Sequence, residues 1–187
     1  MSEELPPEPA STTSFRRRIG SWARDVLETI LPALLIVVLV NAFLAQATRV
    51  EGQSMEPNLH DNQRLIIEKL SYRLQPPQRG DIVVLRLPNR QSDPPLIKRV
   101  VALPGETVET RDGHVYVDGQ ALEESYLDQL TFSNMPPHVV PADQVFVLGD
   151  NRAASNDSRS FGEVALSDIV GRAWFRYWPL DDVGFVR

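Results

Sequence analysis

The strongest constraint on this chain is an uncharged apolar run, "ILPALLIVVLVNAFLAQA", from Ile30 to Ala47. A helix of about 20 such residues spans the hydrocarbon core of a bilayer. A removable signal peptide and a buried core helix are the alternatives. The run is longer than the apolar region of an ordinary signal peptide, and it begins far from the N-terminus. We therefore expect residues 25–47 to form a transmembrane helix.

The residues before this run predict how the helix is oriented. Residues 1–14 are acidic and rich in Pro, Ser and Thr, with too few apolar side chains to offset the entropy of ordering. A basic cluster follows, made of Arg16, Arg17, Arg18 and Arg24. Such clusters stay in the cytoplasm. We expect residues 1–24 to form a cytoplasmic tail, disordered at first and then basic, and everything after Thr48 to lie outside the cytoplasm.

Composition excludes several classes of function. The net charge of -6 leaves no basic excess to neutralise nucleic-acid phosphates, so nucleic acid is not an expected partner. The absence of cysteine excludes disulfides, thiolate zinc sites and a cysteine nucleophile. The three histidines, His60, His114 and His138, are far apart and show no metal-ligand spacing. We expect neither a metal nor an organic cofactor.

The chain after Thr48 predicts strands. Short runs rich in Val, Ile and Leu are broken by Pro, Gly, Asn and Asp, which is typical of strands joined by turns. The expected strands are 64–70, 81–87, 96–103, 106–110, 114–118, 144–150 and 170–178. Residues 48–187 are thus predicted to form a mostly β domain, a folded antiparallel sheet or partly closed barrel, with a small excursion at about 105–143.

Ser54, in "VEGQSMEPNL", follows the apolar run closely and is either a loop hydroxyl or a nucleophile. A nucleophilic serine needs a base, and histidine is the familiar one. Nothing around the three histidines signals a Ser-His-Asp triad, although that arrangement stays open. Lysine is the other option, because burial disfavours the ammonium form and leaves an amine that accepts a proton near neutral pH.

Two lysines are candidates for this base. The segment from Arg49 onward contains thirteen arginines but only Lys69 and Lys98, and arginine does not act as a base. Alternation within its predicted strand places either lysine on an apolar face. A lysine whose stem packs while its amine reaches solvent is the alternative for both. The pattern does not choose between them.

A polar loop, "GDNRAASNDSRSFG", follows the predicted strand 144–150 and covers 149–162. It concentrates short hydrogen-bonding side chains and two arginines. One interpretation is a solvated surface turn. The other is a loop that orients a catalytic group through its hydrogen bonds.

Four segments together resemble the type I signal peptidases, which are membrane-bound serine proteases. "GQSMEPNL" is similar to the family's nucleophile segment, "RGDIVVLR" to the next, "IKRVVALPGE" to the lysine segment and "GDNRAASNDSRSFG" to the last. They occur in the family's order after a membrane anchor, and the resemblance covers nearly everything from Ile30 to Trp178. The implied fold is also similar to that of self-cleaving Ser-Lys repressor domains.

Carried over residue by residue, the resemblance implies roles for individual side chains. Ser54 matches the nucleophile and Lys98 the general base, which resolves the choice left open by alternation. Met55 matches a residue that supports the nucleophile by packing. The matched positions of the last segment are Ser155, whose hydroxyl would orient the lysine amine, Asp157 and Arg159, which would form an ion pair, and Asp150 and Arg152.

Gly52 is a departure from part of the family. Some members carry a serine two residues before the nucleophile, and its hydroxyl helps to stabilise the oxyanion. The glycine here resembles other branches, in which a backbone N–H is expected to serve instead. Since losing one oxyanion donor costs about a hundredfold to a thousandfold in rate, a replacement donor or a water is expected.

The resemblance implies an endopeptidase that removes signal peptides from preproteins after small-residue sites of the Ala-x-Ala type, through an acyl-enzyme. Its partners would be preproteins and membrane lipid. Its catalytic domain would lie on the periplasmic or lumenal side of an inner or thylakoid-type membrane. The alternative from another class is a membrane-tethered β module that binds exported partners without catalysis. The sequence does not indicate an oligomeric state.

Overall fold

Helix α1 (Thr12–Leu39) belongs to the first of two structural units, Met1–Asn41 and Ala42–Arg187. The computed structural model describes residues 12–40, 44–88, 94–131 and 133–186, with residues 12–25 as backbone only. Within those ranges no helix combines the length and the apolar character needed to cross a membrane. The transmembrane helix over 25–47 therefore stays a prediction.

Both ends of α1 differ from the expected boundaries. The helix begins at Thr12, within the predicted tail, and the prolines of that tail all precede Thr12, so none interrupts its first turns. Residues 1–11 of the tail lie outside the described residues. At the other end, strand β1 (Ala45–Arg49) begins inside the predicted span, because its residues pair with β2 (Arg64–Glu68). An apolar pattern alone does not encode that pairing.

The second unit is built on an eight-stranded antiparallel sheet. Along the sheet the order is β1-β2-β11-β3-β4-β9-β10, and β12 pairs with the far part of β11. Register shifts between β4 and β9, and along β11, mark bulges, which increase local twist. The remaining strands of the sheet are β3 (Ile82–Leu85), β4 (Leu96–Ala102), β9 (Gln144–Leu148), β10 (Val164–Ala165), β11 (Ile169–Trp178) and β12 (Gly184–Phe185).

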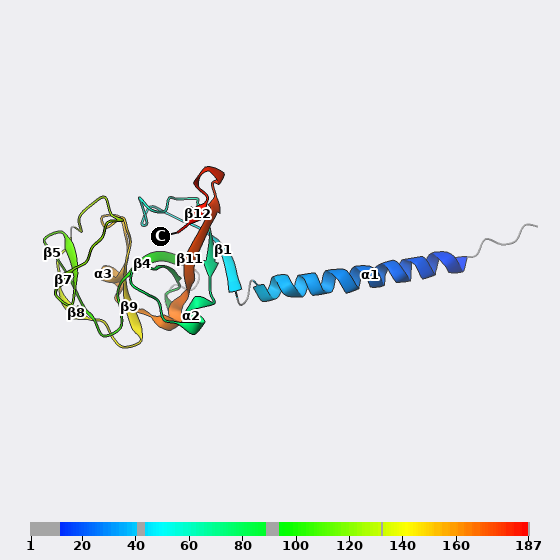
Figure 1. The fold of residues 1–187 in the computed structure, drawn as a ribbon, viewed down its shortest axis with the longest axis horizontal. Coiled ribbons are helices and arrows are strands. Elements are labelled where there is room, and N and C mark those ends of the chain that lie inside the picture. The colour runs from blue at the N-terminus through cyan, green and yellow to red at the C-terminus, as the bar shows by residue number, and fades with distance from the viewer. Residues whose placement is uncertain (1–11, 41–43, 89–93, 132, 187) are drawn as a thin grey trace, which may run out of the picture. The chain divides into compact units, whose positions relative to one another are not determined.

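A smaller four-stranded sheet, in the order β7-β6-β5-β8, coincides with the predicted excursion. Figure 1 shows β5, β7 and β8 together at one side of this unit, with β9 and α3 (Ser158–Phe161) between them and β11. Its strands are β5 (Thr107–Arg111), β6 (His114–Val117), β7 (Gln120–Ala121) and β8 (Met135–Val139). The short helical turns are α2 (Ser71–Leu74), η3 (Leu166–Asp168) and η4 (Leu180–Asp182).

The prediction of a mostly β domain with a curled antiparallel sheet is confirmed. Each of the seven predicted strands overlaps an observed one. The sequence did not reveal β8, because "MPPHV" contains two prolines. That strand lies at the edge of its sheet, where a missing N–H is tolerated. The short strands β7, β10 and β12 were also not predicted.

Three buried apolar clusters hold the β unit together. One of them includes Val50, Met55 and Leu59, which flank Ser54, packed with residues of β2, β3, β4 and β11. Another lies between the larger sheet and the smaller one and includes Phe146 and Val108. The loop that carries Ser54 is therefore anchored in the core at both sides of the serine.

Candidate active site

The Ser54 loop, residues 50–63, connects β1 to β2. Its base is closed by backbone hydrogen bonds from Val50 N–H to Gln63 O (2.8 Å) and from Asn62 N–H to Val50 O (2.9 Å). Met55 is only 1% exposed, so the packing role implied for it agrees with its position. The chain at Ser54 is thereby held rigidly at the surface of the core.

Lys98 of β4 lies against Ser54. Its Nζ is 2.7 Å from Ser54 Oγ and 2.9 Å from the carbonyl oxygen of Ile97. The lysine is 2% exposed. Lys69 follows the end of β2 and is half-buried, and its backbone N–H bonds to the carbonyl of Leu44. Of the two candidates, the structure therefore brings Lys98 to the serine hydroxyl.

Burial changes the acidity of this lysine. Desolvation lowers the pKa of Lys98 from 10.5 to about 8, while the nearby carboxylates of Asp157 and Asp150 act in the opposite direction. At neutral pH a pKa near 8 leaves about a tenth of the molecules with a neutral amine. A proton acceptor is thus available next to the Ser54 hydroxyl.

The three histidines contact other groups. His60 lies 3.8 Å from Glu56, the ring of His114 lies 2.9 Å from the carbonyl of Asp112, and His138 pairs with Glu163. The hydroxyl of Ser54 instead meets the amine of Lys98. A Ser-His-Asp arrangement is therefore not present around Ser54 in the described part of the chain.

Gly149 of the polar loop packs closely against both Ser155 and the backbone of Ser54. A Cβ added to Gly149 would be 2.2 Å from Ser155 Oγ and 2.5 Å from Ser54 O, so only glycine permits this approach. The Asn151 N–H donates to Ser54 O at 3.0 Å. Ser155 Oγ is buried and has no hydrogen-bond partner among the described residues. The structure thus lacks the bond to the Lys98 amine that the resemblance implies.

Asp157 and Arg159 form the ion pair expected within the polar loop. Arg159 Nε and Nη2 donate to the two carboxylate oxygens, each at 2.8 Å. Burial would raise the pKa of Asp157, but the Arg159 guanidinium and the Gly149 N–H hold it below its usual value. Arg159 Nη2 also donates to the carbonyl of Arg152 at 2.8 Å. These contacts give the polar loop a closed shape.

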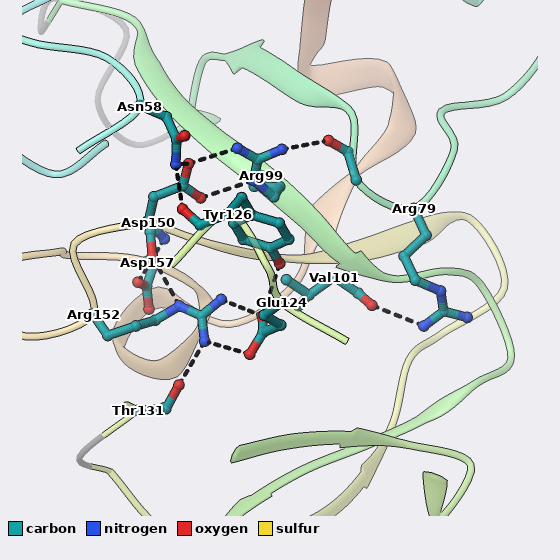
Figure 2. A network of polar contacts seen from close by, with 12 residues as sticks. Asn58, Arg79, Arg99, Val101, Glu124, Tyr126, Thr131, Asp150, Arg152 and Asp157 are labelled. Carbon is teal, nitrogen blue, oxygen red and sulfur yellow. Dashed lines mark hydrogen bonds and ion pairs between the residues drawn. The ribbon is translucent and has the colours of Figure 1, made fainter. Parts of the chain in front are cut away.

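Asp150 and Arg152 each form an ion pair with a residue outside the polar loop (Figure 2). Asp150 accepts from Arg99 Nε at 2.8 Å and from Nη2 at 2.7 Å. Arg152 forms an ion pair with Glu124, and its Nε donates to Gly149 O at 3.0 Å. We did not predict Arg99 or Glu124 as site residues. Arg99 could have been predicted from the sequence, because it is a charged residue next to Lys98 in an otherwise apolar strand. No comparable feature of the sequence marks Glu124.

Gly52 adopts a left-handed backbone with φ +81°. Its N–H donates to Asp61 Oδ1 at 2.9 Å, and Asp61 Oδ2 accepts from the Asn62 side chain at 2.7 Å. The backbone N–H that was expected to replace the missing serine hydroxyl is therefore already engaged by a carboxylate of the same loop.

The model of the family "Signal peptidase, peptidase S26" matches residues 23–178. The chain belongs to this family. The resemblance to the signal peptidases is thus confirmed, and this peptidase is a serine protease of the signal peptidase I type that removes signal peptides.

Relatives of this peptidase cover most of its length. A signal peptidase I of Leptolyngbya laminosa is 39% identical over 182 residues, which cover 94% of this chain and 90% of that protein. A probable signal peptidase I-2 of Synechocystis sp. is 41% identical, with 98% and 81% covered. The chloroplastic thylakoidal processing peptidase 1 of Arabidopsis thaliana is 37% identical, with 79% and 46% covered. A crystal structure of a signal peptidase I from Enterococcus faecalis aligns at 36% identity with a TM-score of 0.45, covering 52% of this chain and 97% of that one.

The buried ion pair between Arg99 and Asp150 is predicted to be important for the stability of the peptidase. Both side chains are at most 3% exposed, so Asp150→Asn leaves a buried guanidinium without its anion. We expect the free energy of unfolding to fall by about 3 kcal/mol, measured by chemical denaturation of the full chain. Glu109→Gln is the matched control, because its partner Arg111 is half-exposed and 3.6 Å away; we expect a loss below about 1 kcal/mol. Equal losses would contradict the prediction.

Proposed function

We propose that Ser54 and Lys98 form a catalytic dyad. The observation that carries this proposal is the 2.7 Å contact between Ser54 Oγ and the Nζ of a lysine that is 2% exposed. The neutral amine accepts the hydroxyl proton while Oγ attacks the carbonyl carbon of the scissile bond. The resulting ammonium donates that proton to the leaving amine, which leaves an acyl-enzyme at Ser54. The same amine then takes a proton from water, and the resulting hydroxide attacks the ester carbonyl. The ester bond to Ser54 Oγ breaks, the ammonium returns its proton to Oγ, and the signal peptide leaves as a carboxylic acid.

Ser155 is proposed to orient the Lys98 amine. Its support is the buried Oγ without a hydrogen-bond partner, held beside Ser54 by the close approach at Gly149. An unsatisfied buried hydroxyl costs about 1–3 kcal/mol, so a hydrogen bond between Ser155 Oγ and the Lys98 amine would be favourable. The carboxylates of Asp150 and Asp157 each carry an arginine partner, which limits their tendency to keep the lysine protonated.

The oxyanion is proposed to be stabilised by hydrogen bonds from the Ser54 N–H and from a second donor. The Gly52 N–H serves only after Asp61 has released it, since the two are hydrogen-bonded at 2.9 Å. A water bound near Gly52 is the other source of that donor. The loss of one such donor costs about a hundredfold to a thousandfold in rate.

The substrates are proposed to be preproteins that are cut after small-residue sites of the Ala-x-Ala type. Cleavage is proposed to occur at a membrane, in which residues 25–47 anchor the protein. The uncharged run and the preceding arginines support a single span with a cytoplasmic N-terminus. Trp174 and Trp178 of β11 are 41% and 48% exposed, and Phe185, beside Trp174, is 62% exposed. Exposed tryptophans favour the membrane interface, which supports lipid as a partner of the β unit.

Substitution of the dyad tests the mechanism. Ser54→Ala and Lys98→Ala should each lower kcat by about a thousandfold or more, because nucleophile and base act as a unit. The assay is cleavage of a preprotein with a small-residue site. Lys69→Ala is the matched control and should leave the rate unchanged. Loss of cleavage in Lys69→Ala with retention in Lys98→Ala would contradict the assignment, and cleavage by Ser54→Ala would exclude the serine.

The pH profile tests the state of the lysine. The base is the neutral amine, so its population falls as pH drops below the pKa of about 8. We expect kcat/KM to rise about tenfold per pH unit below neutrality and to level off above about pH 9. A profile that keeps rising to about pH 10 would indicate an unshifted amine. A flat profile into the acidic range would contradict a lysine base.

Membrane extraction tests the anchor independently of activity. We expect the full chain to stay in the membrane pellet after alkaline carbonate washing and to need detergent for release. The comparison variant is Leu35→Arg with Val38→Arg, since each charge near the centre of a span costs about 2.5–3.5 kcal/mol. That variant should be released. Release of the unchanged protein by carbonate would contradict the anchor.

A further inference from the structure

The segment between β7 and β8 supplies two side chains to the polar network of the candidate active site. Figure 2 shows Glu124 and Tyr126 of this segment beside Arg99, Asp150, Arg152 and Asn58. The segment belongs to the smaller sheet region, which is separate in sequence from the four segments that resemble the family's active site. Its contacts reach β4 and the Ser54 loop, which carry the dyad, and the polar loop that packs against Ser54.

Tyr126 covers the guanidinium of Arg99. Arg99 follows Lys98 directly in β4, and its Cζ lies 4.0 Å from the centre of the Tyr126 ring. The same guanidinium donates to both carboxylate oxygens of Asp150 and to Gly80 O at 3.0 Å. A cation held by a carboxylate fork in its plane and an aromatic ring on its face has one preferred position. The ring thus restrains β4 at the residue next to the lysine.

The backbone of Tyr126 restrains the Ser54 loop. Asn58 lies four residues after Ser54, and its Nδ2 donates to Tyr126 O and to Asp150 Oδ2, both at 2.8 Å. One amide group therefore joins the Ser54 loop, the polar loop and the segment between β7 and β8. The position of the serine is tied to that of Tyr126 by this hydrogen bond.

Glu124 restrains the polar loop through Arg152. Its carboxylate accepts from Arg152 Nη1 at 3.1 Å and pairs with Nη2 of the same side chain, which is fully buried. Arg152 Nε donates to Gly149 O, and Gly149 is a point where the polar loop packs closely against the Ser54 backbone. The Tyr126 hydroxyl donates to Glu124 Oε1 at 2.8 Å. Glu124 and Tyr126 therefore act as one unit.

We infer that Tyr126 and Glu124 are positioning residues for the dyad: they hold β4, the Ser54 loop and the polar loop together so that Lys98 Nζ stays in contact with Ser54 Oγ. Neither has a hydrogen bond or ion pair with either dyad side chain in the described part of the structure, and they act through Arg99, Asn58 and Arg152. The inference rests on the proposed dyad. It gives the segment between β7 and β8 a role in positioning the dyad, while the rest of the small sheet stays outside that role.

Tyr126→Ala tests the inference by the separation of kcat from KM. A misplacement of reacting groups by about 1 Å lowers a rate by about a hundredfold, so we expect kcat to fall about tenfold to a hundredfold. KM should stay within about threefold, because an unchanged KM indicates that substrate binding is intact. Tyr126→Phe keeps the ring over Arg99 and the backbone carbonyl, and it should restore kcat to within about threefold of the wild type.

The matched control is Tyr116→Ala. Tyr116 of β6 stacks on Arg111 at 4.1 Å, which is the same kind of contact in the same small sheet but away from the dyad. We expect no change in kcat. Glu124→Gln is the second variant: it retains the shape of the side chain, and it should lower kcat with KM unchanged even if Tyr126→Ala does not fold, which circular dichroism would reveal.

Any one of several outcomes would overturn the inference: a kcat for a folded Tyr126→Ala no lower than that of Tyr116→Ala, a raised KM with unchanged kcat, or an unchanged kcat in Glu124→Gln. A loss in Tyr126→Phe as large as in Tyr126→Ala would also overturn it, because the ring would then not be the restraint. Failure of the proposed function is a separate result, since it appears as no cleavage by the wild-type protein or as full cleavage by Ser54→Ala.

Discussion

The burial of one amine is the constraint on which the rest of this candidate active site depends. An ammonium group removed from water is destabilised, so burial lowers the pKa of Lys98 to about 8 and raises the share of the neutral amine, which is the form that the proposed dyad requires. Two carboxylates nearby, Asp150 and Asp157, favour the ammonium form instead. Each of them is paired with an arginine, Arg99 or Arg159. The arginines therefore neutralise part of the negative charge of the two carboxylates, which weakens their stabilisation of the Lys98 ammonium.

Two adjacent residues of β4 contact different parts of the site because their side chains point to opposite faces of the strand. Lys98 faces the serine, and Arg99 faces Asp150 and the ring of Tyr126. Buried ion pairs of this kind add little net stability compared with apolar packing, but removing one partner is costly. Their effect here is geometric, since Arg99–Asp150 ties the polar loop to β4 and Asp157–Arg159 closes the polar loop on itself.

Local patterns account for most of what could be predicted. Alternation and turn residues located the seven main strands because both signals act over a few neighbouring residues. The same patterns did not find β8, where two prolines occur at a sheet edge, and they extended the apolar run into β1. They left Lys69 and Lys98 equivalent, because each alternates with apolar neighbours. The ordered set of four similar segments separated these two lysines, as periodicity did not.

The sequence by itself determined the residue types of the site, the strand pattern of the domain and the membership of a peptidase family. Only the tertiary structure decided which groups meet. Arg99 and Asp150 are 51 residues apart, Asn58 and Asp150 are 92 apart, and the Gly52 N–H is taken by Asp61 across the loop. Such pairs depend on strand order and register, which follow from burial summed over the whole domain. No local pattern carries that information, so the partner of each charged side chain was set only when the sheets packed together.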